Sequence, residues 1–248
     1  MSSNLRFRLP ALAALALAFA APQASASGEW EGVVAPYLWG AGITTDLDMD
    51  TPPVSGGSDN DFTDLIDEID GIFQIHGEIQ NDRWGFFADF AFIGLAAEEE
   101  RTLFDSESDL DVRLSELAAV WSPADGKFQG IEVFGGLRRV EVDFTSDFTP
   151  HNPALPDARV DFDRGYNDFL LGARYTVPLA DRWSLTLRGD GSFGDTDGTW
   201  GASAMFGYKG SHGDWLMGYR YLSGNFNNDN GDLDIALSGF QVGYGFRF

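Results

Sequence analysis

Apolar and polar residues alternate with a period of two through most of the chain after residue 28, in runs long enough to cross a bilayer as tilted strands. The run 168–179 has an apolar face, and its opposite face carries Gly172, Arg174 and Thr176. The runs 183–194, 199–209 and 233–248 repeat this pattern. A period of two with one apolar face predicts β-strands in a sheet whose two faces meet different surroundings.

Ten strands are predicted, and their connections alternate between short and long. The expected strands span 30–43, 71–80, 84–96, 110–121, 131–145, 168–179, 183–194, 199–209, 215–225 and 233–248. Long loops are expected at 44–70, 97–109 and 146–167, and tight turns at 81–83, 180–182 and 211–214. If the less regular runs 110–121 and 131–145 are not strands, the count becomes eight.

The predicted fold is all-β, a closed antiparallel up-and-down transmembrane β-barrel with a short helix in the first extracellular loop. A soluble β-sandwich also alternates, but its apolar face is seldom so aromatic. Tryptophan favours membrane interfaces, where the ring lies in hydrocarbon and the N–H meets water. The seven tryptophans fall near the predicted strand ends, which predicts two interface girdles formed by Trp30, Trp39, Trp84, Trp121, Trp183, Trp200 and Trp215.

The first 26 residues have the features of a cleaved secretory signal. Arg6 and Arg8 precede an apolar run, Ala11 to Ala21, and Ala24-Ser25-Ala26 forms the expected cleavage site. The apolar run is too short to cross a bilayer as a helix. Residues 27–248 are therefore expected to form a single barrel domain.

Composition excludes several classes of function. The formal net charge is −23, which repels nucleic acid, and the chain has no cysteine for a disulfide or a thiolate metal site. No later segment approaches 18 consecutive apolar residues, so any membrane insertion is expected to use strands.

The terminal run Gly239-Phe240-Gln241-Val242-Gly243-Tyr244-Gly245-Phe246-Arg247-Phe248 resembles the last strand of small Gram-negative outer-membrane β-barrels, of the OmpA-like and porin-like kinds. The resemblance implies an outer-membrane location. Because bacterial barrels have tight periplasmic turns and long extracellular loops, the order of short and long connections is expected to place both termini in the periplasm. The resemblance also implies that Phe246 and Phe248 are the signal for the barrel-assembly machinery, and that outer-membrane lipid and lipopolysaccharide surround the barrel. It implies no substrate, and the sequence leaves open whether the protein is a monomer or a homo-oligomer.

Charged residues on the predicted inward faces would share a narrow bore. They are Glu78, Asp89, Arg174, Arg188, Asp190, Arg220 and Arg247, with Glu116 and Arg138 added if the register allows. Buried charges must be paired. Two interpretations stay open: a structural plug of salt bridges, or a wetted path whose charges select small solutes.

The first predicted loop is strongly acidic. Asp46, Asp48 and Asp50 alternate as hard-cation ligands do, but the loop lacks the glycine and distal glutamate of an EF-hand. Loosely bound divalent cations are the only cofactor expected. Helical spacing in the same loop predicts a short amphipathic helix that closes the barrel mouth as a lid, with an apolar stripe of Phe62, Leu65, Ile66 and Ile69.

The predicted function is a passive outer-membrane barrel, either a narrow channel or a structural and surface-interaction protein. The alternative is a hydrolase or acyl-transfer enzyme that uses a histidine. Of the three histidines, His76 lies beside Glu78 on one strand face and His151 lies in a predicted loop, whereas His212 is in a turn. No sequence motif of an outer-membrane enzyme surrounds them, so we expect no catalysis.

Overall fold

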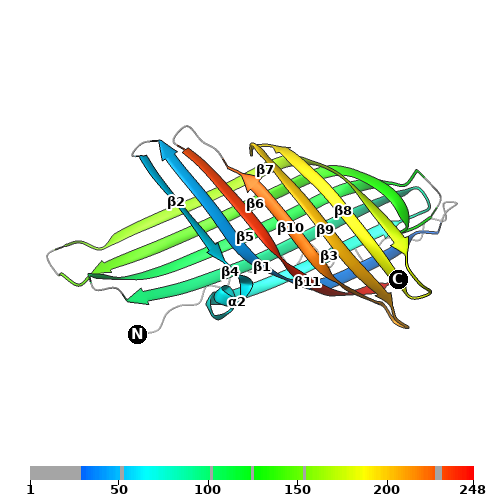
Figure 1. The fold of residues 1–248 in the computed structure, drawn as a ribbon, viewed down its shortest axis with the longest axis horizontal. Helices are drawn as coiled ribbons and strands as arrows, with labels where there is room; N and C mark the ends of the chain where they lie inside the picture. Colours follow the sequence, from blue (N-terminus) through cyan, green and yellow to red (C-terminus); the bar gives the residue numbers. More distant parts are fainter. Residues whose placement is uncertain (1–28, 51–52, 101–102, 124–125, 153–154, 227–230) are drawn as a thin grey trace.

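The fold is a closed antiparallel β-barrel with ten strand positions in its wall (Figure 1). The computed structural model describes residues 29–50, 53–100, 103–123, 126–152, 155–226 and 231–248. The predicted signal segment lies outside these residues. The described elements are β1 (Glu31–Asp50), β2 (Pro53–Asn60), α2 (Phe62–Leu65), η1 (Ile66–Glu68), β3 (Ile69–Gln80), β4 (Trp84–Glu100), β5 (Phe104–Trp121), β6 (Gly130–Pro150), β7 (Ala158–Pro178), β8 (Trp183–Gly194), β9 (Gly198–Lys209), β10 (Asp214–Asn225) and β11 (Gly231–Arg247).

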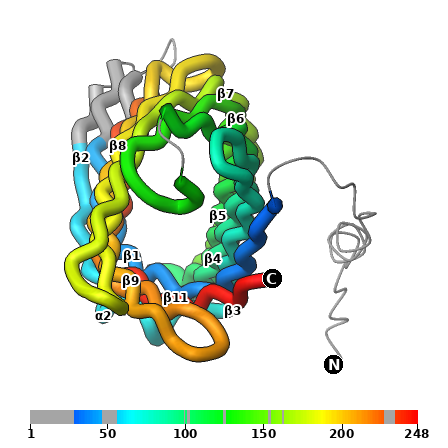
Figure 2. Tube along the Cα trace, turned by 90° about the vertical axis from the view of Figure 1, so that its right-hand side faces the viewer, coloured from blue at the N-terminus to red at the C-terminus, as the bar shows by residue number. Residues whose placement is uncertain are grey.

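Neighbouring strands pair in chain order, and β11 returns to pair with β1, which closes the barrel. Figure 2 shows the closed ring from the end where the C-terminus lies. Two strands share one edge of β1: β3 pairs with Glu31–Pro36, and β2 pairs with Ile43–Asp50. Together β2 and β3 fill one wall position, interrupted by α2 and η1. The prediction of ten positions is therefore confirmed.

The ends of the barrel differ in length. At the turn end, where the first described residues and the C-terminus lie, the strands begin and end within two residues of the predicted limits. At the opposite loop end, β4, β5, β6 and β7 continue far beyond β8 and β9 and form a sheet extension (Figure 1).

The prediction of three long loops was wrong, because strands occupy most of the residues in those segments. Acidic residues give these segments a loop-like composition. Along the strands, however, the acidic residues on one face alternate with apolar or hydroxyl residues on the other. Leu110 pairs with Phe144, for example, and Val112 pairs with Val142. Such pairs stabilise strands whatever the other face carries.

The outer surface of the barrel carries an apolar belt. Phe169, Leu171, Phe193 and Phe240 are each more than 60% exposed. Six tryptophans, Trp30, Trp84, Trp121, Trp183, Trp200 and Trp215, are also exposed on the wall.

Trp39 was placed wrongly by the girdle prediction, because it is only 1% exposed. It belongs to an apolar cluster inside the barrel with Ala41, Ala91, Leu114 and Leu222. Both faces of β1 are largely apolar between Val33 and Leu38, so alternation did not reveal which one faces inward. A second interior cluster consists of Phe87, Ala118, Val120, Phe134 and Leu170.

Among the described residues, no helix has the length and apolar character needed to cross a membrane.

Candidate functional site: the charged interior

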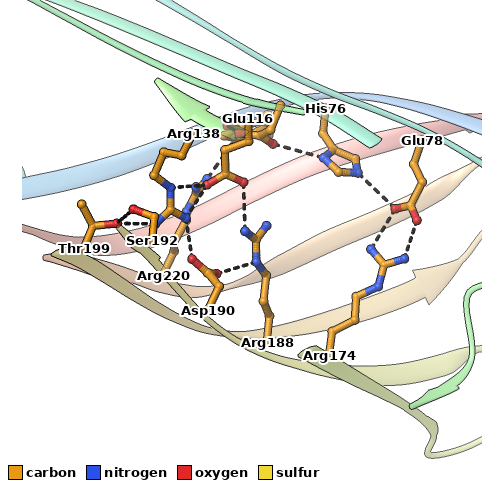
Figure 3. Close-up of polar contacts among 12 residues, drawn as sticks. His76, Glu78, Glu116, Arg138, Arg174, Arg188, Asp190, Ser192, Thr199 and Arg220 are labelled. Carbon is orange, nitrogen blue, oxygen red and sulfur yellow. Dashed lines mark hydrogen bonds and ion pairs between the residues drawn. The ribbon is translucent and has the colours of Figure 1, made fainter. Parts of the chain in front are cut away.

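Inward-facing charged residues from seven strands form a connected network in the middle of the barrel (Figure 3). Of the predicted lumenal residues, the structure places Glu78, Asp89, Arg174, Arg188, Asp190 and Arg220 in this network. Arg247 instead lies at the turn end, where its half-exposed side chain is ion-paired with Asp214.

Glu116 on β5 is the centre of one half of the network, and its side chain has no exposed surface. Arg138 donates to Oε1 from Nε at 3.0 Å and from Nη2 at 2.5 Å. Arg188 donates to Oε2 at 2.9 Å, and Nη2 of Arg220 lies 3.7 Å from Oε1. Asp190 accepts from Arg138 and, at 2.7 Å, from Arg188. Buried carboxylates need such compensation because an isolated buried charge is strongly unfavourable.

The other half of the network joins two glutamates through Arg174. The guanidinium donates to both oxygens of Glu78 and, from Nε at 2.7 Å, to Glu132. The side-chain amide of Gln80 donates to both glutamates at 2.6 Å. The sequence analysis missed Glu132 and Gln80, although each falls on the inward face if the strand alternation is extended to it.

His76 connects the two halves. Its Nδ1 lies 3.1 Å from Asp89 Oδ2, and its Nε2 lies 3.3 Å from Glu78 Oε2. Ionised carboxylates only accept hydrogen bonds, so this geometry fits an imidazolium that donates from both nitrogens. Tyr37 donates to the other oxygen of Asp89 at 2.7 Å, and Arg220 lies over the ring of Trp39. Within the described residues, no serine or threonine hydroxyl is hydrogen-bonded to His76.

Hydroxyl groups continue the network toward the loop end. Arg138 donates to Thr199 at 2.7 Å, and Thr199 shares a 2.6 Å hydrogen bond with Ser192. Ser192 and Thr196 both donate to Asp168, at 2.7 and 2.5 Å. The polar side chains thus span the interior from β3 and β5 to β7, β8 and β10, and leave their charges compensated by one another.

A cavity of about 400 Å³ lies between this network and the turn end. Small side chains on β8 to β11, among them Ser203, Gly207 and Gly243, leave this space. The residues of the β5–β6 connection that directly precede β6 curl into the opening, as Figure 2 shows in green, and place Lys127 and Phe128 in the cavity lining. The Phe128 N–H donates to Gln80 at 2.7 Å, and Lys127 is ion-paired with Glu31.

Phe128 adopts a φ of 54°, which is strained for a residue with a bulky side chain. Such strain persists only where surrounding contacts fix the backbone. The hydrogen bond to Gln80 and the ring contact with Arg247 supply those contacts here. The inward position of this connection was not predicted.

The predicted cation ligands do not lie in a loop. Asp46, Asp48 and Asp50 belong to β1, where Asp46 pairs with Asp234 of β11. The side chains of Asp48 and Asp50 lie outside the described residues. Within the described part of the chain, no group of three or more acidic or histidine side chains is arranged to hold a metal ion.

The predicted helix exists as α2 and η1, but its placement as a lid was wrong. The segment fills the wall between β1 and β4, beside the interrupted strand position, instead of crossing the mouth (Figure 1). Leu65 is buried and Phe62 packs at Gly40, whereas Ile66 is 53% exposed. Phe62 and Leu65 are therefore already packed in the wall, and the segment does not have to cover the mouth to bury them.

The remaining predicted sites lie near the barrel ends. His151 pairs with Asp105 at 2.8 Å, and both are exposed at the loop end. His212 contacts Ser211 in an exposed turn. Phe248 exchanges two backbone hydrogen bonds with Gly32, and both Phe246 and Phe248 are exposed on the outside.

Comparison with known proteins shows the fold alone. The outer-membrane protease OmpT of Escherichia coli superimposes with a TM-score of 0.51 at 9% identity, over 92% of this chain and 99% of that one. The Ail protein of Yersinia pestis gives a TM-score of 0.37 at 12% identity, over 89% and 100%. OprG of Pseudomonas aeruginosa gives 0.32 at 13%, over 90% and 96%. No family model matches the sequence, and neither does any curated protein.

Proposed function

We propose that the protein is a non-conducting β-barrel of a Gram-negative outer membrane, with a structural and surface-interaction role. The observation that carries this proposal is the burial of Glu116 among Arg138, Arg188 and Arg220 across the bore. An open pore needs hydrated side chains along its length, whereas this carboxylate has no exposed surface. The structural plug is therefore favoured over the selective path.

The membrane location is supported by the outer apolar belt and by the exposed tryptophans near the strand ends. A surface of this kind is far more apolar than that of a soluble monomer. In the proposed orientation the short turns and both termini face the periplasm, and the sheet extension projects from the cell. Membrane lipid, lipopolysaccharide and the assembly machinery that reads Phe246 and Phe248 are the proposed partners.

The extension gives the proposed surface role its chemistry. Asp109, Asp111, Asp143, Asp161 and Asp163 lie on the outward face of β5, β6 and β7. Arg113 is ion-paired with Asp111 and Asp143, and Arg159 with Asp161, so carboxylates outnumber the arginines that neutralise them. This face would attract loosely held divalent cations and cationic partners.

A catalytic role is not supported by the surroundings of the histidines. His76 is held between two carboxylates of the network, which leaves no free ring nitrogen to act as a base. A panel of fluorogenic peptide and lipid substrates tests this, and turnover that disappears in His151→Ala or His76→Gln would establish the enzyme instead.

Liposome swelling tests the closed bore directly. Vesicles that contain the folded protein are expected to swell in small sugars and amino acids no faster than protein-free vesicles. Swelling with a clear solute-size cut-off would show an open path and would overturn the proposal.

A further inference from the structure

The barrel wall is split between β1 and β3. The ladder between these strands ends at the pair Pro36 and Ile75, and β1 gains β2 as a partner only from Ile43 onward. The six intervening residues of β1 pair with a strand on one edge only, where the partner is β11. Proline has no N–H to continue a ladder, which is consistent with the strands parting here.

This split in the wall, between the end of the β1–β3 ladder and Ile43, is called the seam. The side chain of Gln74 bridges the end of the seam that adjoins the β1–β3 ladder. Its Oε1 accepts from the backbone N–H of Trp39 at 2.5 Å, and its Nε2 lies 3.5 Å from the Trp39 carbonyl oxygen. The side-chain amide thus takes the place of a neighbouring strand for one residue. Gln74 is only 3% exposed.

The segment formed by α2 and η1 closes the rest of the seam without bonding to it. Its backbone bonds are local, from the N–H groups of Asp64 and Leu65 to the carbonyl of Asp61. Within the described residues, no hydrogen bond joins Phe62 through Glu68 to a barrel strand. Apolar contact alone holds this part of the wall, unlike the laddered strands around it.

Behind the segment lies a small cavity lined only by carbon-rich side chains. Its lining includes Phe62 and Leu65 from the segment, Ile69 at the start of β3, and Ile93, Val112 and Leu237 from inward-facing strand positions. The volume is about 30 Å³, so the cavity holds little while the segment is seated. Apolar cavities of this kind stay dry and take apolar ligands.

The outer side of the seam meets the apolar belt. Gly40 pairs directly with Phe240, which is 78% exposed on the barrel surface. Ile66 is exposed beside the seam, together with the acidic residues Asp64 and Asp67. A long apolar molecule could therefore lie across the seam with its tail inward, while the exposed carboxylates favour a head group that carries positive charge.

We propose that the seam between β1 and β3 is the entrance to a binding site for a lipid hydrocarbon chain, with the carbon-lined cavity as its inner end. The chain enters when α2 and η1 swing outward, and it replaces Phe62 and Leu65 in their contacts with the cavity wall. The head group stays outside beside the acidic residues. The site is distinct from the charged network and does not depend on whether the bore conducts.

Two glycines of β1 allow the segment to be moved or fixed by design. A Cβ at position 42 would lie 2.8 Å from the backbone oxygen of Asn60 and 3.3 Å from the backbone nitrogen of Phe62, so Gly42→Ala is expected to displace the start of the segment from the seam. A Cβ at position 40 would lie 2.9 Å from the Phe62 ring, so the pair Gly40→Cys and Phe62→Cys can staple it in place. The chain has no other cysteine. Gly77→Ala is the matched control, because its Cβ would meet nothing within 4 Å.

The test is photolabelling in vesicles of phosphatidylcholine with a diazirine at the end of one acyl chain, followed by mass-spectrometric mapping. Outward Phe240 is labelled in every variant and serves as the internal reference. Inward Ile93, Leu95 and Val112 are expected to be labelled in the wild type, several-fold more strongly in Gly42→Ala, and as in the wild type in Gly77→Ala. The oxidised staple is expected to reduce the inward labelling to background, and reduction of the disulfide to restore it.

Inward labelling that persists in the oxidised staple would show that the chain enters through the barrel mouth, and would overturn the proposal. So would the absence of inward labelling from both the wild type and Gly42→Ala, with barrel folding verified by heat-modifiable gel mobility.

Discussion

Arg138 donates two hydrogen bonds to a single oxygen of Glu116, and neither side chain is more than 1% exposed. The two residues are direct cross-strand partners on β5 and β6, so the strand register alone brings them together. The barrel closes around this pair and adds Arg188 and Arg220 from the opposite wall.

Removing the charge of Glu116 should therefore be costly. Glu116→Gln leaves three arginines short of a buried counter-charge, and the free energy of unfolding is expected to fall by about 3–5 kcal/mol. Urea unfolding in detergent micelles, followed by tryptophan fluorescence, measures it. Glu141→Gln is the control, since Glu141 and Arg139 form a half-exposed pair worth at most about 1 kcal/mol. Equal losses in the two variants would contradict the central place of Glu116.

Trp39 should behave as a core residue. Trp39→Ala is expected to lower the free energy of unfolding by about 3–5 kcal/mol, because it empties a large volume among Ala41, Leu114 and Leu222. Trp84→Ala, on the outer wall where Trp84 is 53% exposed, should cost clearly less. The same urea titration compares the two. A larger loss for Trp84→Ala would mean that Trp39 does not pack inside.

Gly239 should be required for closure of the barrel. A Cβ at this position would lie 1.8 Å from the carbonyl oxygen of Gly40 on β1, so Gly239→Ala forces apart the two strands that close the ring. Its yield of heat-modifiable folded protein is expected to fall several-fold. Gly189→Ala, where a Cβ would meet nothing within 4 Å, should fold as the wild type does. Normal folding of Gly239→Ala would show that β1 and β11 do not pack as closely as the closed ring requires.

The sheet extension should respond to acid. Asp143 and Asp163 are cross-strand partners beyond the membrane-spanning part, and the hydrogen bond and charge of Asp143 raise the pKa of Asp163. A raised pKa means that the folded extension holds this proton more tightly than the unfolded chain. The extension is therefore expected to be more stable below the ordinary aspartate range, and to lose that contribution as the pH rises through the raised pKa.

Amide hydrogen exchange of β6 and β7 across this pH range, with rates corrected for intrinsic exchange, measures the change. Asp143→Asn removes the repelling charge, so the pH dependence assigned to Asp163 should shrink. An unchanged dependence in this variant would assign it to other carboxylates.

The sequence predicted the barrel and its strand count because β7, β8, β9 and β11 alternate cleanly between apolar outward residues and polar inward ones. Alternation along these and the less regular strands identified six members of the charged network, including Arg188 and Asp190 on one strand. It failed where both faces of a strand are apolar, as around Trp39, and where acidic residues on one face gave the extension a loop-like composition. Glu132 was missed because its neighbours Ile131 and Val133 were not assigned to the outside.

Other features depend on contacts that no local pattern encodes. The role of Gln74 as a substitute for a strand requires the parting of β1 and β3, which the pairing of the whole wall decides. The inward curl at Phe128 depends on Gln80, which lies 48 residues earlier in the chain. The helical spacing of residues 62–69 predicted the segment, but its seat in the wall required the space left by Gly40 and Gly42.

The most direct test of the closed barrel is single-channel conductance of the folded protein in a planar bilayer at two salt concentrations. The network around Glu116 predicts a silent bilayer in the wild type, with insertion verified independently by protease protection. Stable, discrete conductance steps that scale with salt would show a continuous wetted path through the network, and would contradict the account.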